Sequence, residues 1–495
     1  MEACVAIYTD IKSGLLALVT IMALTTSTWA VGGGAPADTQ AQGFPDSLRR
    51  YSDSGKVPFK IGTAVIFQGG PNRNGYHPGI LGSGERDRAI QSIISTQFNQ
   101  IEPENELKMM SLWTDVERVD GHYAAVTNLF DDDGPLAKAC HWAQSMPHPV
   151  TVRGHCMVYH PRYNLPRFQA GHAALFDGTD GSIKLNPAYS PNDLRDLLES
   201  FVRQSVDAGM VHNAMSRVRH KYKVIEMWDV TNEVVSDDTQ AAPFPGIGFA
   251  YRHNDPWYAN GPRLTADAPG YDYVADIYRW ADDEMRQNAG KTVHGQKITA
   301  GDGFSLYYND YNLEWNPEKM KRTLALIDHV RASGGRVDGL GFQAHIEAKS
   351  PISPQFEKSI QAAIDDKLRF AITELDCAIS RKSDPGTPPV DEQEKLQGTN
   401  VAEVAGLCVK YGTSCDCLQW WGATDDGSWL PNAEATLITR WVAAAGGKEG
   451  YWPKQGQHVP ATTVDPETGD LDMTSARSTS DAFDKVLDVL RQAAR

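Results

Sequence analysis

The chain has 495 residues, and its 47 Lys and Arg against 63 Asp and Glu give a formal net charge of −16. Binding to nucleic acid or to an anionic membrane surface needs clustered basic side chains, so this balance argues against both kinds of partner. A hydrophobic fraction of 41%, with 12 Trp and 18 Tyr, excludes a disordered chain and indicates an acidic globular protein.

Near the N-terminus, residues 14–26 form an apolar run that follows Lys12. The run is short for a membrane-spanning helix, which needs about 20 apolar residues, and Ala30 offers the small residue of a cleavage site. We therefore expect residues 1–30 to be a secretory signal peptide and residues 31–55 a leader segment, followed by one large domain over residues 56–495. An uncleaved N-terminal anchor is the alternative.

The seven cysteines are too few for a disulfide framework. Three of them cluster near the C-terminus, and a secreted protein permits one bridge among Cys408, Cys415 and Cys417. No CxxC pair is present, which argues against a zinc site. The remaining cysteines of the large domain are expected to pack as small hydrophobic residues; they are Cys140, Cys156 and Cys377.

Eight β-rich runs alternate with amphipathic stretches along the large domain. The expected strands are residues 59–66, 98–102, 150–158, 224–230, 298–308, 337–344, 368–375 and 417–422. The expected helices are residues 85–96, 193–208, 271–289, 317–333, 354–366, 401–411 and 481–494. Ser190, Pro191 and Asp193 supply a good helix start, with a hydroxyl cap, a proline in the first turn and an acid near the positive end of the helix dipole.

Eight strand–helix repeats predict an α/β protein with a (β/α)8 barrel. A doubly wound parallel sheet is the alternative, but no glycine-rich phosphate fingerprint follows the first strand. Residues 169–189, 236–270 and 446–479 are too long for plain loops. Because loops after barrel strands form the active-site face, the first two are expected to be extended loops that shape a cleft. The three acids at residues 131–133 are expected to be a solvated helix start rather than a calcium site.

Two strands end in carboxylates that point to chemistry. Glu233 ends the fourth expected strand and Glu374 ends the seventh. A single glutamate at a strand end is often part of a structural ion pair, but two from strands three apart in a closed barrel face the same cavity. Such a pair can cleave a glycosidic bond with retention, one carboxyl acting as nucleophile and the other as acid and base.

His155, Gln343 and His345 end the third and sixth expected strands. A metal centre would gather these histidines with a carboxylate, but no His-x-His or His-Glu-x-x-His pattern is present. Buried histidines bonded to backbone are a second interpretation, and positioning of sugar hydroxyls and of the nucleophile is favoured over both. Trp421 lies at the end of the last expected strand and Trp429 follows it, at a cleft where exposed indoles stack on sugar faces. No Gly-x-Ser-x-Gly, P-loop or dinucleotide motif appears.

Together these segments resemble glycoside hydrolase family 10, the retaining endo-β-1,4-xylanases. Residues 228–233 (WDVTNE) are similar to the family's acid/base segment, and residues 372–376 (ITELD) are similar to its nucleophile strand. Further blocks match in the family's order: residues 103–108, 153–155, 306–314, 341–345, 421–422 and 428–429. The matches span roughly residues 59–430.

The resemblance implies a role for each site residue. Glu233 would be the acid/base and Glu374 the nucleophile, with His345 bonded to the nucleophile and Asp376 supporting it. The residues that would bind substrate are Glu104, Asn105, Lys108, His155, Tyr159, Asn232, Gln343, Trp421 and Trp429. The resemblance also implies a disulfide between Cys408 and Cys415. It implies no metal and no cofactor, because two carboxyl groups complete the chemistry.

Several positions depart from the family pattern. Met109, Tyr159 and Phe168 stand where the family usually has Trp, and residues 161–162 read Pro-Arg instead of Ser-Gln. The chemistry should survive these changes, while substrate preference should differ. Arg162 is hypothesised to meet an acidic decoration such as glucuronic acid on the substrate.

The sequence therefore predicts a secreted, monomeric barrel enzyme that hydrolyses internal bonds of xylan, with no membrane partner once the signal is cleaved. One rival is a glycosidase of the same fold acting on another β-glycan or on short oligosaccharides, with residues 236–270 closing the cleft. The other rival is a catalytically weak carbohydrate-binding barrel.

Overall fold

The computed structural model describes residues 46–495 except 73–74, 167, 169–172, 178–182, 239, 242, 244–247, 253, 264–267, 381–385, 431–432, 443–448, 455–462, 465–470 and 473–479. The predicted signal peptide and most of the leader lie outside the described residues, as do parts of the three long connections. The described residues all belong to one compact unit.

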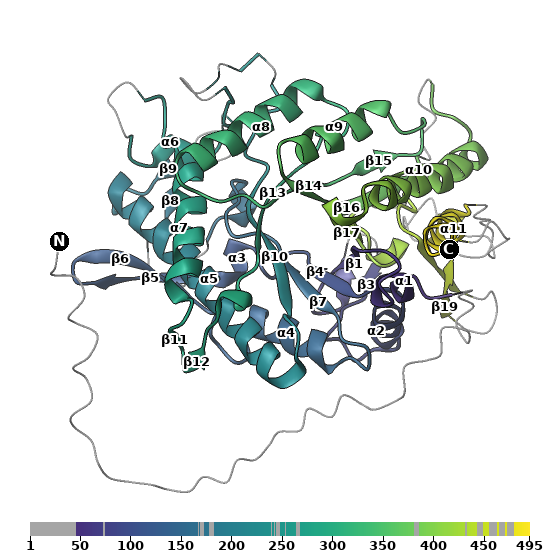
Figure 1. Cartoon of the computed structure of the whole chain (residues 1–495), viewed down its shortest axis with the longest axis horizontal. Coiled ribbons are helices and arrows are strands. Elements are labelled where there is room, and N and C mark those ends of the chain that lie inside the picture. Colours follow the sequence, from purple (N-terminus) through teal and green to yellow (C-terminus); the bar gives the residue numbers. More distant parts are fainter. Residues whose placement is uncertain are drawn as a thin grey trace, which may run out of the picture. The chain divides into compact units, whose positions relative to one another are not determined.

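Eight parallel strands close into a barrel (Figure 1). In chain order they are β1 (Lys60–Val65), β4 (Gln100–Pro103), β7 (Thr151–Gly154), β10 (Ile225–Asn232), β13 (Ser305–Asp310), β14 (Gly339–Phe342), β16 (Arg369–Ala378) and β17 (Cys415–Trp420). Each strand pairs with the next, and β17 pairs with β1 to complete the ring. The predicted (β/α)8 fold is confirmed, and every expected strand overlaps one of these eight.

A long helix follows each barrel strand and packs around the outside of the ring (Figure 1). These helices are α2 (Glu85–Gln97), α4 (Pro135–Ser145), α5 (Pro191–His220), α7 (Tyr273–Asn288), α8 (Pro317–Ala332), α9 (Pro354–Asp365), α10 (Val390–Tyr411) and α11 (Ala482–Ala493). The sequence did not predict α4, and α5 and α10 are longer than expected. The start of α5 is a capping box, in which Ser190 accepts from the Asp193 amide and Asp193 accepts from the Ser190 amide, as the sequence indicated.

Short elements decorate the loops. They are the helices α1 (Arg49–Asp53), α3 (Met109–Leu112) and α6 (Pro256–Asn260), and the strand β15 (His345–Glu347), which pairs with the end of β16. The described residues also form six two-stranded pairs: β2 (Gly70–Asn72) with β3 (Gly75–His77), β5 (Trp113–Val119) with β6 (His122–Thr127), β8 (Phe176–Asp177) with β9 (Lys184–Leu185), β11 (Thr292–Val293) with β12 (Gln296–Lys297), β18 (Ile438–Val442) with β19 (Glu449–Pro453), and β20 (Thr463–Val464) with β21 (Leu471–Asp472). Residues 131–133 are exposed just before α4, as expected for a solvated helix start.

The main hydrophobic core joins the barrel strands to the surrounding helices. Trp228 and Trp420 are among its largest fully buried side chains, so Trp420 belongs to the core. A small second cluster takes one residue from each of four barrel strands: Met227, Tyr307, Ala371 and Cys417. Among the described residues, no helix has the length and the apolar character needed to cross a membrane.

All six cysteines in the described part of the chain are buried, and each is present as a free thiol. Cys408 near the end of α10 and Cys415 at the start of β17 are brought together, and the disulfide between them stays a prediction. Cys140, Cys156 and Cys377 are buried as predicted.

Candidate active site

The two glutamates lie at the same end of the barrel, on strands separated by β13 and β14. Glu233 directly follows β10, and its φ of 56° places it in the left-handed region that residues other than glycine rarely adopt. Glu374 lies within β16 and is only 5% exposed. Because the strands are parallel, both side chains reach the face formed by the strands' carboxyl ends.

One amide, that of Asn309 on β13, connects the two glutamates. Its Nδ2 donates to Glu374 Oε1 at 2.7 Å and to Asn232 Oδ1 at 2.9 Å. Asn232 in turn donates to Glu233 Oε1 at 3.2 Å. Thr373 Oγ1 donates to Asn309 Oδ1 at 2.7 Å, which fixes the orientation of the amide. The sequence placed Asn309 in a matching block but gave it no role.

His345 joins Glu374 to a second carboxylate. Its Nε2 lies 3.1 Å from Glu374 Oε2 and its Nδ1 lies 2.8 Å from Asp376 Oδ2. Trp429 Nε1 donates to the same Asp376 oxygen at 2.9 Å. Although burial lowers the pKa of His345, the charges and hydrogen bonds of Asp376 and Glu374 raise that pKa well above its usual value. The imidazole is therefore protonated and donates from both nitrogens.

These contacts separate the pKa values of the two glutamates. Burial is the largest single influence and raises the pKa of Glu374, but the hydrogen bond from His345, the neighbouring His155, the charge of His345 and the Asn309 hydrogen bond together outweigh it, and the pKa falls to about 2. Burial and then the negative charge of Asp310 raise the pKa of Glu233, against a hydrogen bond that Gln343 Nε2 donates at 3.0 Å. The site thus holds one ionised carboxylate and one carboxyl that keeps its proton more readily.

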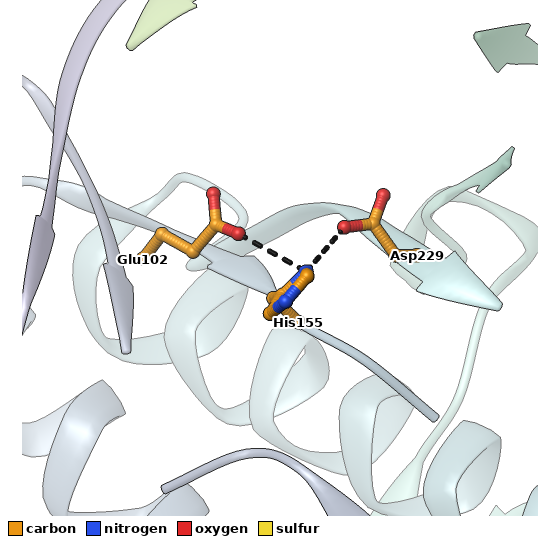
Figure 2. A group of neighbouring side chains, drawn as sticks. All are labelled: Glu102, His155 and Asp229. Atoms are coloured by element: carbon orange, nitrogen blue, oxygen red, sulfur yellow. Dashed lines mark hydrogen bonds and ion pairs between the residues drawn. The ribbon is translucent and has the colours of Figure 1, made fainter. Parts of the chain in front are cut away.

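A buried ionic cluster comes from β4, the end of β7 and β10 (Figure 2). Glu102, His155 and Asp229 each offer a ligand atom, all within 4.8 Å of one another, so the group has the spacing of a metal site. The guanidinium of Arg153 pairs with both carboxylates, at 2.7 Å from Glu102 and in direct contact with Asp229. Arg153 supplies one positive charge against the two carboxylates, and we assign the cluster to holding His155, whose Nδ1 lies 2.8 Å from Asp229 Oδ2. Burial lowers the pKa of His155 to about 4, so its ring is neutral.

The predicted substrate-binding residues at the ends of β4 and β7 also come together. Lys108 Nζ donates to Asn105 Oδ1 at 3.3 Å and lies 5.8 Å from the centre of the Tyr159 ring. Burial, together with the charges of Glu106 and Glu374, raises the pKa of Glu104 to about 7, against the lowering effect of Lys108. Asn105 is exposed, whereas Lys108 and Tyr159 are buried.

The two predicted tryptophans flank the histidines. Trp421 is 6% exposed and packs edge-on against His155, with ring centres 5.6 Å apart. Trp429 is 51% exposed and lies 5.3 Å from the His345 ring. Trp429 therefore has a free face for a ligand, while Trp421 closes the space beside the histidines.

A second charged network, which the sequence did not reveal, lies behind Glu233. Lys319 Nζ is 2.8 Å from Asp310 Oδ1 and 2.7 Å from Asp237 Oδ1. Arg252 is 2.8 Å from Asp237 Oδ2 and donates to the backbone carbonyl of Glu233. The network ties the segment after β10 to β13 and α8.

Two of the departures from the family pattern lie in the core. Met109 is fully buried, and Phe168 packs against Trp113 with ring centres 6.1 Å apart. Arg162 is exposed in a single 3₁₀ turn, Arg162–Asn164, that follows the β7 segment. Tyr159 lies in the site beside Lys108, so the departures are found in the core, in the site and on the surface.

Comparison with known proteins agrees with this geometry. The profile of the family described as Glycosyl hydrolase family 10 matches residues 79–446. The chain belongs to glycoside hydrolase family 10. Endo-1,4-beta-xylanase A of Cellvibrio japonicus is 26% identical over 352 residues, which are 71% of this chain and 44% of that enzyme. Endo-1,4-beta-xylanase B of Paenibacillus barcinonensis is 24% identical over 316 residues, 62% of this chain and 77% of that enzyme. The chain thus spans less than half the length of the first of these relatives.

Solved structures of family 10 enzymes share the fold. Native xylanase 10B from Thermotoga maritima superposes with a TM-score of 0.56 at 20% identity, covering 90% of this chain and 99% of that one. A mutant of xylanase 10C from Cellvibrio japonicus, in complex with xylopentaose, superposes with a TM-score of 0.57 at 18% identity, covering 90% and 69%. At identities this low, the structural similarity establishes that the proteins share the barrel fold.

For a family 10 glycoside hydrolase, this site has the parts that the chemistry needs. An ionised carboxylate can attack a sugar carbon while a protonated one gives its proton to the leaving oxygen. Protonated His345 keeps Glu374 ionised, and the raised pKa of Glu233 keeps a proton available. Two carboxyl groups with separated pKa values are the usual sign of such a division of roles.

Proposed function

We propose that this glycoside hydrolase is a retaining endo-β-1,4-xylanase, with Glu374 as nucleophile and Glu233 as acid and base. The observation that carries the proposal is the separation of the two pKa values, with Glu374 at about 2 and Glu233 above its ordinary value. The named relatives, which are endo-1,4-beta-xylanases, support xylan as substrate.

In the first step of the proposed reaction, Glu374 forms a bond to the anomeric carbon while the glycosidic C–O bond breaks. Glu233 gives its proton to the departing oxygen. The charge of Glu374 disappears in the glycosyl ester, which removes one of the influences that raise the pKa of Glu233. Glu233 then takes a proton from water as that water attacks the anomeric carbon, and Glu374 leaves as a carboxylate.

The surrounding polar side chains would position the sugars. Asn232, held by Asn309, would bind the 2-hydroxyl at the cleavage subsite, where such a bond strengthens in the transition state. His155 and Gln343 would line the same subsite. Glu104, Asn105 and Lys108 would bind the next sugar toward the non-reducing end, and the exposed face of Trp429 would stack on a sugar ring.

The test is the product ladder from glucuronoxylan treated with the full chain and separated by anion-exchange chromatography. A spread of xylo-oligomers, released first with the β configuration in proton NMR, is expected. Release of xylose alone would mean that the groove is closed. If xylan gives no products but another β-glycan is cleaved, the proposed substrate is wrong. E374A should lose activity, whereas E117A, a change at an exposed glutamate on the β5–β6 hairpin, should keep it. Retained activity in E374A would refute the nucleophile assignment.

We also propose that the enzyme is secreted and acts as a monomer. The apolar run at residues 14–26 followed by Ala30 supports export. N-terminal sequencing of protein recovered from the culture medium should begin at Val31, and light scattering should give the mass of one chain. Recovery only with membranes, with an intact N-terminus, would favour the uncleaved anchor.

A further inference from the structure

A buried carboxyl group lies behind the turn that serves both glutamates. Glu314 follows β13 and is completely buried. Its Oε1 accepts a hydrogen bond from the Ala344 amide at 2.6 Å. Ala344 has a φ of 57°, in the left-handed region that alanine rarely adopts. The hydrogen bond therefore holds a backbone conformation that the residue itself does not favour.

The two neighbours of Ala344 reach different glutamates. Gln343 Nε2 donates to Glu233 at 3.0 Å, and His345 Nε2 lies 3.1 Å from Glu374. Residues two apart in an extended strand share a face, but here the strand is broken: β14 ends at Phe342 and β15 begins at His345. The relative orientation of the Gln343 and His345 side chains therefore depends on the left-handed conformation of Ala344 between them.

The surroundings of Glu314 indicate that its carboxyl group serves as a hydrogen-bond acceptor rather than as a negative charge. Its Oε2 has no hydrogen-bond partner within the described part of the chain. Burial raises the pKa of Glu314 to about 7, against the hydrogen bonds from the backbone N–H groups of Glu314 itself and of Ala344 and, after these, the nearby charges of His345 and Lys319. An ionised carboxylate with one buried, unpaired oxygen is costly, so the neutral acid is the favoured form below that pH. In that form the Oε1 atom still accepts the Ala344 N–H.

We propose that Glu314 is a positioning residue for both glutamates, because its carboxyl oxygen holds the Gln343–Ala344–His345 turn that orients their hydrogen-bond donors. The names of the two roles rest on the proposed function, but the positioning itself does not. The side chain of Glu314 bonds to the Ala344 amide and not to Glu233 or Glu374. It would therefore act on the two glutamates only through the turn.

Loosening this turn should shift the pKa values of both glutamates in the same direction. The Gln343 hydrogen bond lowers the pKa of Glu233, and the His345 hydrogen bond lowers that of Glu374. E314A removes the acceptor and weakens both, so both pKa values should rise. The other groups that influence the two pKa values stay in place: Asp310 and Arg252 beside Glu233, and His155 beside Glu374.

The experiment is a carbon-13 NMR titration of the glutamate carboxyl groups in the full chain, which needs no substrate. In E314A the pKa of each glutamate should rise by roughly half a pH unit or more. E314Q keeps an amide oxygen for the Ala344 N–H and should restore both values toward wild type. E314M has a similar length but no such oxygen, so it replaces E314A if that variant does not fold. D302A is the matched control, because Asp302 is also buried and accepts a backbone N–H, from Thr299 at 2.7 Å, before β13 begins.

Unchanged pKa values in folded E314A or E314M would overturn the proposal, and so would a shift in E314Q as large as that in E314A. A shift in D302A equal to that in E314A would show a general loss of stability and would also overturn it. Activity adds a separate readout: both limbs of the pH profile of kcat/KM should move to higher pH in E314A. If wild type does not cleave xylan at all, the proposed function fails while the titration still decides the role of Glu314.

Discussion

Replacing His345 with glutamine tests the origin of the low pKa of Glu374. That pKa is about 2, compared with 4.5 for an ordinary glutamate, a difference of about 2.5 pH units. At 1.36 kcal/mol per pH unit this corresponds to about 3 kcal/mol in favour of the ionised form, with burial working against it. Glutamine keeps a donor but no charge, so we expect the pKa of Glu374 to rise to about 5 in H345Q.

The consequence appears in the acidic limb of the pH profile. An acid with a pKa near 5 is only about one-tenth ionised at pH 4, so kcat/KM of H345Q should fall about tenfold between pH 6 and pH 4. Wild type should stay nearly flat over that range. The assay is kcat/KM on an aryl β-xylobioside from pH 3 to pH 9, with the fold monitored by circular dichroism.

A matched control separates the nucleophile from general effects of losing a histidine. His329 Nε2 lies 2.6 Å from Asp272 Oδ2, on α8 and away from the glutamates. H329Q should therefore lower stability without moving the acidic limb. A folded H345Q that remains active and flat down to pH 4 would refute the reasoning, because Glu374 would then be ionised without its cation.

The same pKa predicts acid sensitivity of the fold. Because the folded pKa of Glu374 lies below its unfolded value of about 4.5, its ionised form stabilises the native state above that pH. This stabilisation is lost as the pH falls from about 4.5 toward 2. Urea titrations at pH 6 and pH 3 should show a smaller acid-induced loss in H345Q than in wild type.

Three further predictions follow from individual contacts. N309A removes a hydrogen bond to the ionised Glu374 and should lower kcat about 10- to 100-fold, equivalent to about 1.5–3 kcal/mol, in steady-state kinetics; an unchanged kcat would exclude the connecting role of Asn309. K454M leaves Asp425 without its buried partner at 3.1 Å and should reduce the free energy of unfolding in urea by about 3 kcal/mol, whereas K485M, at a partly exposed pair, should cost less than about 1 kcal/mol. R162Q should slow cleavage of glucuronoxylan more than that of a neutral xylan, and equal relative rates would remove Arg162 from substrate selection.

The strands could be predicted because buried parallel strands are continuous apolar runs. Helices are predicted from apolar periodicity, and two of them lose that pattern over part of their length. The first half of α10 buries Gln393, Gln397 and Asn400, which hydrogen-bond to the backbone of β16 and of neighbouring loops. An inward face made of amides carries no apolar periodicity, so the sequence indicated a helix only from residue 401. In α5, Gly209 interrupts the pattern because the Phe304 ring leaves no room for a Cβ there.

The site was predictable in its residue types and not in its connections. Glu233 and Glu374 stand out because carboxylates at the ends of apolar strands are rare. Asn309 and Glu314 act across the barrel, on partners that lie 30 or more positions away in the chain. Nothing local marks them, because their importance depends on strand order and on the left-handed turn at Ala344.

The Asn309 amide has a consequence for anyone who transplants this site. β13 carries neither glutamate, yet its amide contacts Glu374 on one side and Asn232, the residue before Glu233, on the other. The spacing between the two carboxyl groups is therefore set by a strand that a search for catalytic residues would pass over. A designer who moved only β10 and β16 into another barrel would carry over both acids without Asn309, the residue whose amide sets their spacing.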